Sequence, residues 1–239
     1  MYLSVIIPAY NEERRIASTL RSVDAYLRRQ SYDYEVLVAS DGSKDGTASL
    51  VRGMETEIKN LRLVDNKDNH GKGYVVKQGM LEAKGDLRLF TDADNSTSID
   101  HLDLFIPYIG QGFDVVIGSI AVKGHKVAEG SEPFWRRILG KLGNFFIQIM
   151  AVPGIHDTQR GFKLITAKAA QRIFPKMLIT RWGFDIEMLA LARKFGYKIK
   201  ELPVDWKNDP NSKVGLNAYI QVLSETVKIR LNILMGKYN

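Results

Sequence analysis

The sequence predicts a single α/β domain, with a mostly parallel central sheet and helices on both faces. Three observations lead to this fold class. The 239 residues are enough for one large buried core, and the composition, 45% hydrophobic and 26% charged, is that of an ordinary folded protein. Four strand-and-helix repeats fill roughly the first 91 residues, which is typical of parallel sheets. No internal repeat or linker divides the chain.

The first repeat begins with an apolar strand at Leu3–Ile7, and Pro8 ends it because proline cannot donate to a strand ladder. Asn11 is a good helix N-cap, and the two acidic residues after it suit the first turn of a helix. One face of that helix is apolar, with a helical spacing of Ile16, Leu20, Val23 and Leu27. The stretch therefore reads as one βα unit.

Three further repeats follow the same pattern. A strand at Glu35–Ala39 leads through a polar loop to a helix that Thr47 caps. A strand at Leu61–Val64 precedes a helix that Gly85 ends. The fourth strand, Leu87–Thr91, runs directly into Asp92-Ala93-Asp94.

Beyond residue 100 the alternation is less regular. We expect helices at Ile99–Ile109, Phe134–Met150 and Phe184–Phe195 and strands at Asp114–Gly118, Phe162–Ile165 and Tyr197–Val204. Residues 1–213 then form the domain, and residues 214–239 an amphipathic helix that packs on it, on a partner copy or on a membrane surface.

Polar motifs follow the carboxyl ends of these strands, which is where open α/β sheets bind ligands. They are Tyr10, Asp41, Gly71-Lys72-Gly73, Asp92 and Asp94. In an extended Asp-x-Asp the two carboxylates lean the same way and can converge on Mg²⁺ or Mn²⁺. With 16 Asp in the chain, one such pair is expected by chance, so its place among the other motifs carries the argument.

Composition and charge narrow the classes of function. The chain has no Cys, which excludes disulfides and thiolate metal sites. Residues 1–118 carry 14 basic and 18 acidic side chains, whereas residues 119–239 carry 20 and 9, so the second half suits an anionic partner. Basic residues are not interleaved with aromatic residues that could stack on bases, which disfavours nucleic acid as the anionic partner. Without a leader or a long apolar run, we expect a cytoplasmic protein, peripheral at the inner face of a membrane.

The motifs also resemble a known family. Val5-Ile6-Ile7-Pro8-Ala9-Tyr10-Asn11-Glu12, Ser40-Asp41-Gly42-Ser43-Lys44-Asp45-Gly46-Thr47, Gly71-Lys72-Gly73 and Asp92-Ala93-Asp94 stand in the order and spacing of family 2 inverting glycosyltransferases with the GT-A fold. In the second half, Asp157-Thr158-Gln159-Arg160-Gly161-Phe162-Lys163, Arg181-Trp182-Gly183-Phe184-Asp185-Ile186-Glu187 and Val204-Asp205-Trp206 look like the branch that glucosylates dolichyl phosphate.

The resemblance implies roles on the donor side. Asp94 would ligate Mg²⁺ or Mn²⁺, and Asp92 would contact the metal or the donor ribose. The other residues implied in binding a nucleotide sugar are Pro8, Tyr10, Glu12, Asp41 and Lys72. The metal would stabilise the negative charge that builds on the departing diphosphate.

On the acceptor side the resemblance implies cations that hold a phosphate: Arg136, Arg137, Arg160 and Lys163. Asp157 is the candidate base for a hydroxyl acceptor, and with a phosphate acceptor it would orient the sugar or these cations. Gln159 and Trp182 would line the same cavity, and Lys213 would contact the donor phosphates from a late loop. All four His residues are expected to be structural or solvent-facing.

Two positions depart from the family pattern. Ser40 stands where the second motif usually opens with an acidic residue, and Ile120 stands where relatives often place Arg. Lys123 is the expected substitute for that arginine.

The expected activity is transfer of glucose from UDP-glucose to a polyprenyl or dolichyl phosphate at a membrane surface. Three alternatives stay open: mannose transfer from GDP-mannose, a transferase that uses a saccharide hydroxyl, and a binding module without catalysis. A homodimer is also left open, with the apolar faces of Phe134–Met150 and the C-terminal helix as candidate contacts.

Overall fold

A computed structural model describes residues 1–124, 134–207 and 216–239. Its centre is a seven-stranded sheet in the order β3-β2-β1-β4-β6-β5-β7. The strands are β1 (Leu3–Ala9), β2 (Tyr34–Asp41), β3 (Leu61–Asn66), β4 (Leu87–Thr91), β5 (Val115–Ser119), β6 (Phe162–Thr166) and β7 (Ile199–Pro203). All neighbouring strands pair in parallel except β6, which runs antiparallel to both β4 and β5. The predicted mostly parallel sheet is confirmed.

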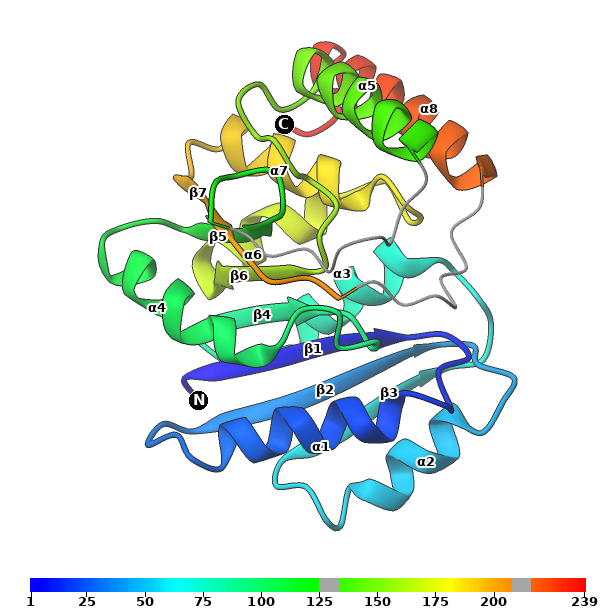
Figure 1. Ribbon diagram of the computed structural model, residues 1–239, viewed down its shortest axis with the longest axis vertical. Helices are drawn as coiled ribbons and strands as arrows, with labels where there is room; N and C mark the ends of the chain where they lie inside the picture. Colours follow the sequence, from blue (N-terminus) through cyan, green and yellow to red (C-terminus); the bar gives the residue numbers. More distant parts are fainter. Residues whose placement is uncertain (125–133, 208–215) are drawn as a thin grey trace.

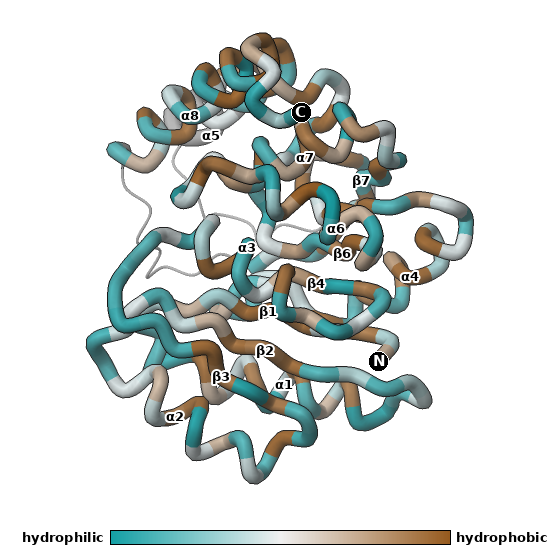
Figure 2. Tube along the Cα trace, turned by 180° about the vertical axis from the view of Figure 1, so that it is seen from behind, coloured by the Kyte–Doolittle hydropathy of each residue, from teal (hydrophilic) through white to brown (hydrophobic). Residues whose placement is uncertain are grey.

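Helices cover both faces of the sheet, as predicted (Figure 1). They are α1 (Ile16–Leu27), α2 (Thr47–Met54), α3 (Lys72–Glu82), α4 (Leu102–Gly110), α5 (Phe134–Met150), α6 (Ala167–Ile173), α7 (Phe184–Lys194) and α8 (Leu216–Leu234), with single 3₁₀ turns at Ile99–His101 and Phe174–Lys176. One buried apolar cluster joins α1, α2 and α4 to the sheet, and a second joins α3, α6 and α7 to its other face. The apolar segments coloured brown in Figure 2 follow the central strands between these layers.

The strands β1 and β4 stop pairing at the place where the candidate site begins. Their pairing starts at Leu3 and Leu87 and ends at Ile6 and Phe90, although β1 continues beside β2 as far as Ala9. Pro8 fits this divergence because it has no N–H to offer a neighbouring strand. Chain connections lead away from β1 and β4 on opposite sides, so this is the point of the sheet where α/β proteins bind ligands.

The structure corrects three details of the predicted elements. Asn11 is not an N-cap: it has a positive φ of 55°, and α1 begins only at Ile16. Thr47 is the first residue of α2 rather than its cap, and Gly46 precedes it. The helix α6 was not predicted, because seven residues are too few to show a helical period.

The helices α5 and α8 lie side by side at one end of the molecule, and α8 also packs on α7 (Figure 1). Their outer faces leave several large apolar side chains exposed: Leu142, Phe145, Ile149, Ile220, Leu231, Leu234 and Met235. No helix in the described ranges is long and apolar enough to cross a bilayer.

The C-terminal residues are anchored in the core by a buried polar contact. Tyr238 is fully buried, and its hydroxyl donates to Glu187 Oε1 at 2.6 Å. Glu187, also fully buried, accepts from the backbone N–H groups of Leu178 and Ile179 at 2.9 to 3.0 Å. The end of the chain is thereby tied to α7 and to the segment that precedes it.

We expect Tyr238→Phe to lower the free energy of unfolding by about 1–2 kcal/mol, because the buried Glu187 carboxylate loses one charge-assisted hydrogen bond. Urea denaturation followed by circular dichroism measures this. The matched control is Tyr219→Phe on α8, where the tyrosine is 44% exposed and the same loss of a hydroxyl should leave the midpoint unchanged. Equal midpoints for Tyr238→Phe and the unmodified chain would contradict the anchoring role.

Candidate active site

The turns after β1 and β2 are tied together by short polar contacts. The N–H of Asn11 donates to Ser43 Oγ at 3.1 Å, and Asn11 Oδ1 accepts from the N–H of Lys44 at 2.8 Å. The N–H of Glu12 donates to Thr47 Oγ1 at 2.8 Å. The left-handed backbone of Asn11 turns the chain after β1 toward the loop after β2. The two loops therefore form one unit at the carboxyl end of the parallel strands.

This unit places the residues predicted to hold a nucleotide. Tyr10 is 39% exposed on its surface, while Pro8 is buried in β1. The Glu12 carboxylate pairs with the Arg15 guanidinium at 2.5 Å, so a ribose hydroxyl would have to share it with that arginine.

Asp41, at the end of β2, is 3% exposed and holds the turn before α3. Its carboxylate accepts from the N–H of His70 at 2.7 Å, from the N–H of Gly71 at 2.9 Å and from Asn69 Nδ2 at 2.9 Å. Each carboxylate oxygen has two lone pairs, so these bonds leave capacity for one more donor. Asp41 therefore has a structural role that the sequence did not indicate.

The two carboxylates of Asp92-Ala93-Asp94 lie at the end of β4, beside the first residue of α3. Lys72 Nζ is 2.7 Å from Asp92 Oδ1, and the two side chains are each 27% exposed. Asp94 Oδ1 accepts from the N–H of Ser96 at 2.9 Å. In the part of the chain that the structure describes, no group of three or more His, Cys, Asp or Glu residues gathers as a metal site. The contacts given above use Oδ1 of each Asp. A cation bound by the two carboxylates would take its other ligands from a bound molecule or from water.

The glycines around Lys72 are needed for packing. Gly71 has a φ of 104°, and a Cβ there would lie 2.5 Å from the carbonyl oxygen of Thr180. A Cβ on Gly73 would lie 2.6 Å from Cβ of Phe184. These two glycines therefore let the start of α3 pack closely against Thr180 and against Phe184, the first residue of α7.

Lys163 contradicts its expected role. We expected it to contact an acceptor phosphate, but its side chain is fully buried within β6. Its ammonium pairs with Asp185 Oδ1 at 2.7 Å and donates to the carbonyl of Arg160. Burial raises the pKa of Asp185, and the nearby ammonium groups of Lys163 and Lys72 offset part of that effect. The resemblance assigns no role to Asp185, and its place between apolar residues in Phe184-Asp185-Ile186 is the sequence feature that indicates burial.

A second polar group surrounds Asp157. Asp157 Oδ2 accepts from Arg160 Nε at 3.0 Å and from the N–H of Ile120 at 3.1 Å. The guanidinium of Arg160 also lies over the Trp206 ring, 4.4 Å from its centroid. Arg160 is thus held on two sides, which leaves its terminal nitrogens able to face an anion. Ile120, one of the two positions expected to depart from the family pattern, contacts this group through its backbone N–H.

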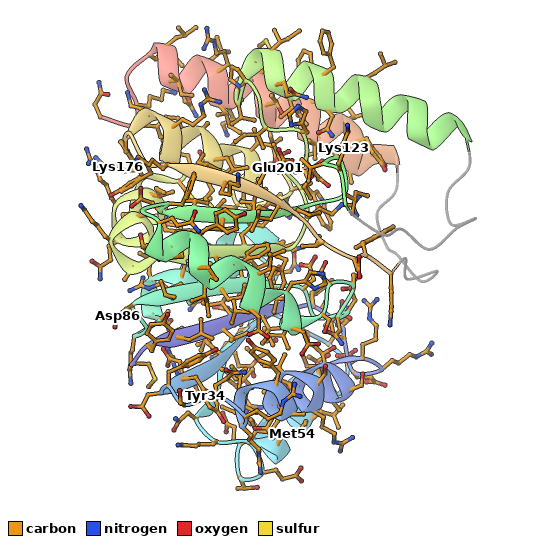
Figure 3. The ribbon with its side chains drawn as sticks, turned by 60° about the vertical axis from the view of Figure 1, so that its left-hand side comes forward. Tyr34, Met54, Asp86, Lys123, Lys176 and Glu201 are labelled. Atoms are coloured by element: carbon orange, nitrogen blue, oxygen red, sulfur yellow. The ribbon has the colours of Figure 1, made fainter. Side chains whose placement is uncertain are left out.

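Glu201 of β7 positions this group (Figure 3). Its carboxylate accepts from the N–H groups of Asp157 at 2.8 Å and His156 at 3.1 Å. Neither the role of Glu201 nor the stacking of Trp206 is predictable from local sequence patterns, because their partners lie more than 40 residues away along the chain.

The other residues predicted for the site take no part in the contacts above, or lie outside the residues that the structure describes. Gln159 and Lys123 are exposed, and Trp182 is partly buried beside the core. The side chains of Arg136 and Arg137 and all of Lys213 lie outside the described residues. Among the histidines, His101 Nε2 accepts from the N–H of Asp205 at 3.0 Å, which agrees with a structural role.

Gly161 brings the two halves of the site together. Its carbonyl accepts from the N–H of Asp92 at 3.2 Å, and a Cβ on Gly161 would lie 2.6 Å from Asp92 Oδ1 and closer still to Oδ2. Arg160 precedes Gly161 in the chain, so its backbone adjoins the residue that packs on Asp92. The arrangement is suited to a reaction between two phosphate-bearing molecules.

Comparisons with known proteins agree with this chemistry. The family model Glycosyl transferase family 2 matches residues 4–174. The chain belongs to this family of enzymes, and its fold is GT-A. It is 39% identical to the dolichyl-phosphate beta-glucosyltransferase of Dictyostelium discoideum, over 99% of this chain and 76% of that protein. The corresponding human enzyme is 32% identical, over 99% of this chain and 77% of the relative.

A solved structure supports the fold. The glucosyl-3-phosphoglycerate synthase of Mycobacterium tuberculosis, in complex with Mn²⁺, UDP-glucose and phosphoglyceric acid, has a TM-score of 0.67. The similarity covers 96% of this chain and 79% of that one, at 19% sequence identity.

Proposed function

We propose that this enzyme transfers glucose from UDP-glucose to a dolichyl or polyprenyl phosphate. The Dictyostelium and human relatives, at 39% and 32% identity, are named for glucosyl transfer to dolichyl phosphate, and the similarity covers 99% of this chain in each case. The observation that carries the proposal is the position of Arg160, stacked on Trp206 and one residue from the glycine that packs on Asp92. An anionic acceptor at Arg160 would then lie next to the donor diphosphate.

The donor would lie along the edge formed by β1, β2 and β4. Tyr10 is exposed enough to pack on the base, and Pro8 shapes the turn beneath it. Glu12 and Asp41 are the proposed contacts of the ribose and the base, and Asp41 has acceptor capacity for one more donor beside its bonds to the loop around it. Lys72, partly exposed at the start of α3, would meet the diphosphate.

Asp92 and Asp94 would hold Mg²⁺ or Mn²⁺, with diphosphate oxygens as further ligands. The residues fit such an ion: Asp92 already has a cation, the Lys72 ammonium, 2.7 Å from one oxygen, and both carboxylates are partly open. When bound, the metal would supply stabilisation for charge on the leaving diphosphate.

The acceptor needs no base, since a lipid monophosphate with a second pKa near 6 is already anionic at neutral pH. An acceptor phosphate oxygen attacks C1 of glucose, the bond from C1 to the diphosphate oxygen breaks, and UDP leaves with that electron pair. Inversion at C1 gives a β-linked glucosyl lipid phosphate. Arg160 would orient the attacking phosphate, with Asp157 orienting Arg160. Gln159 and Trp182 remain proposed contacts of the sugar or acceptor, and Arg136 and Lys213 proposed contacts of the acceptor and donor phosphates.

We further propose that the exposed apolar face of α5 and α8 rests on the membrane that holds the acceptor lipid. Residues 1–213 would form the catalytic domain, and the C-terminal helix would add this contact. Exposed Lys228 and Arg230 on α8 suit anionic headgroups. Co-sedimentation with phosphatidylglycerol vesicles tests the contact. A dimer in sedimentation velocity, without vesicle binding, would instead assign the face to a second copy.

A radiolabelled transfer assay tests the activity. We expect a lipid product from UDP-glucose and polyprenyl phosphate that requires Mg²⁺ or Mn²⁺ and disappears with EDTA. GDP-mannose and a saccharide acceptor serve as matched alternatives. Product only from GDP-mannose would change the donor, and product only with a hydroxyl acceptor would overturn the proposed acceptor.

A further inference from the structure

Four charged side chains meet around the ring of Phe90, and the proposed function uses only two of them. Lys72 is 2.7 Å from Asp92, and Lys163 is 2.7 Å from Asp185. Both ammonium groups lie over Phe90, 5.4 Å and 5.6 Å from its centroid. The two ion pairs therefore form one cluster, with charges of alternating sign.

The members of this cluster differ in their freedom to move. The side chains of Lys163 and Asp185 are 0% and 5% exposed, and Lys163 is also bound to the Arg160 carbonyl. Asp185 is fixed in the first turn of α7, where the helix dipole favours a carboxylate. Lys72 is partly exposed and has a flexible four-carbon stem, so it is the cation that can change partner.

Lys72 interacts with both carboxylates. Burial disfavours its charged form, but the carboxylates of Asp92 and Asp185 outweigh burial and raise the pKa of Lys72. The same attraction is seen from the other side, because Lys72 is among the cations that favour ionised Asp185. The Lys72 ammonium lies over the same Phe90 ring as the Lys163 ammonium, which is 2.7 Å from Asp185. Asp185 is therefore near enough to act as a second partner for Lys72.

We propose that the Lys72 side chain has two positions, one paired with Asp92 and one turned to the donor diphosphate. Asp185 is the positioning residue that makes the second position available. In the first position, the Lys72 ammonium pairs with Asp92 at 2.7 Å as the counter-cation of the Asp-x-Asp motif. With a divalent cation held by Asp92, the ammonium would be repelled and would turn to the donor diphosphate, while Asp185 would keep it in the site. This inference rests on the proposed nucleotide-sugar chemistry and gives a role to Asp185, a buried carboxylate that the proposed chemistry does not use.

The first test measures Mn²⁺ binding to the protein without nucleotide, by titration calorimetry. Because Lys72 competes with the metal for Asp92, we expect Lys72→Met to tighten Mn²⁺ binding about threefold to tenfold. The matched control is Lys59→Met, in an exposed lysine that precedes β3 at the opposite edge of the sheet. Unchanged or weaker Mn²⁺ binding by Lys72→Met would overturn the first position.

The second test measures UDP binding in the presence of Mn²⁺. Asp185→Asn alone leaves buried Lys163 unpaired and risks unfolding, so the comparison is made in a Lys163→Met background. We expect Lys163→Met/Asp185→Asn to bind UDP about tenfold more weakly than Lys163→Met, and adding Lys72→Met to cause little further loss. Circular dichroism checks that each variant is folded.

Equal UDP affinity in the single and double variants would show that Asp185 serves Lys163 alone, and would overturn its positioning role. Independent losses from Asp185→Asn and Lys72→Met would do the same. Neither measurement requires turnover. A protein that binds Mn²⁺ and UDP as stated but transfers no glucose would contradict the proposed function and leave this inference standing.

Discussion

Gly161→Ala is expected to reduce transfer by about 100-fold or more while the protein stays folded. A Cβ at this position would overlap the Asp92 carboxylate, 2.6 Å from Oδ1 and closer to Oδ2, so Asp92 must leave its place beside Asp94. The backbone of Gly161 does not have a positive φ, so alanine introduces no conformational strain of its own. The measurement is kcat/KM for glucosyl transfer, together with Mn²⁺ affinity, and both should fall.

The control for this variant is Gly53→Ala on α2, where an added Cβ meets no heavy atom within 4 Å. We expect Gly53→Ala to keep full activity and equal or slightly higher stability, because alanine is the better helix former. Since Asp92 is partly exposed and can turn outward, Gly161→Ala should cost only about 1 kcal/mol of unfolding free energy. Full transfer activity in Gly161→Ala would show that the position of Asp92 does not matter to the reaction.

The importance of Gly161 depends on a feature of topology that local sequence patterns do not reveal. The sequence predicts the parallel half of the sheet well, because each βα unit there has a complete apolar period and a turn signal. It does not show that β6 runs antiparallel between β4 and β5, which is what places Gly161 against Asp92. The strand was predicted, but its direction and neighbours are decided by packing among distant segments.

The candidate site divides in the same way. Asp92, Asp94, Lys72 and Asp41 could be proposed from the sequence because each stands at the end of a predicted strand or the start of a helix. Lys163 was assigned to a phosphate because a lysine in a motif suggests a ligand, whereas its burial and its pairing with Asp185 arise only in the folded sheet. The stacking of Arg160 on Trp206 likewise joins a residue before β6 to a residue after β7. Residue types were therefore predictable, and their partners were not.

The chemistry of the acceptor makes opposite predictions for Arg160 and Asp157. A phosphate acceptor needs a cation and no base, so we expect Arg160→Ala to lower kcat/KM for the lipid by about 100-fold. Asp157→Asn should lower it only about tenfold, mainly through the KM of the lipid. The asparagine oxygen can still accept from the N–H of Ile120, and the guanidinium of Arg160 remains stacked on Trp206. Steady-state kinetics with polyprenyl phosphate give both values.

Arg172→Ala is the matched control, because Arg172 also lies over an aromatic ring, 4.8 Å from the centroid of Phe195, but on α6 away from the Asp-x-Asp edge. Arg172→Ala should leave kcat/KM and the KM of the lipid unchanged. The comparison then shows whether activity falls because an arginine stacked on a ring is lost or because the cation that binds the acceptor is lost. The reverse ranking would point to a different acceptor. A general base contributes about 10²- to 10⁴-fold, so a hydroxyl acceptor predicts that Asp157→Asn is the severe variant and Arg160→Ala the mild one. Since the same two substitutions separate a lipid phosphate from a saccharide hydroxyl, the pair distinguishes the acceptor classes even before the lipid itself is identified.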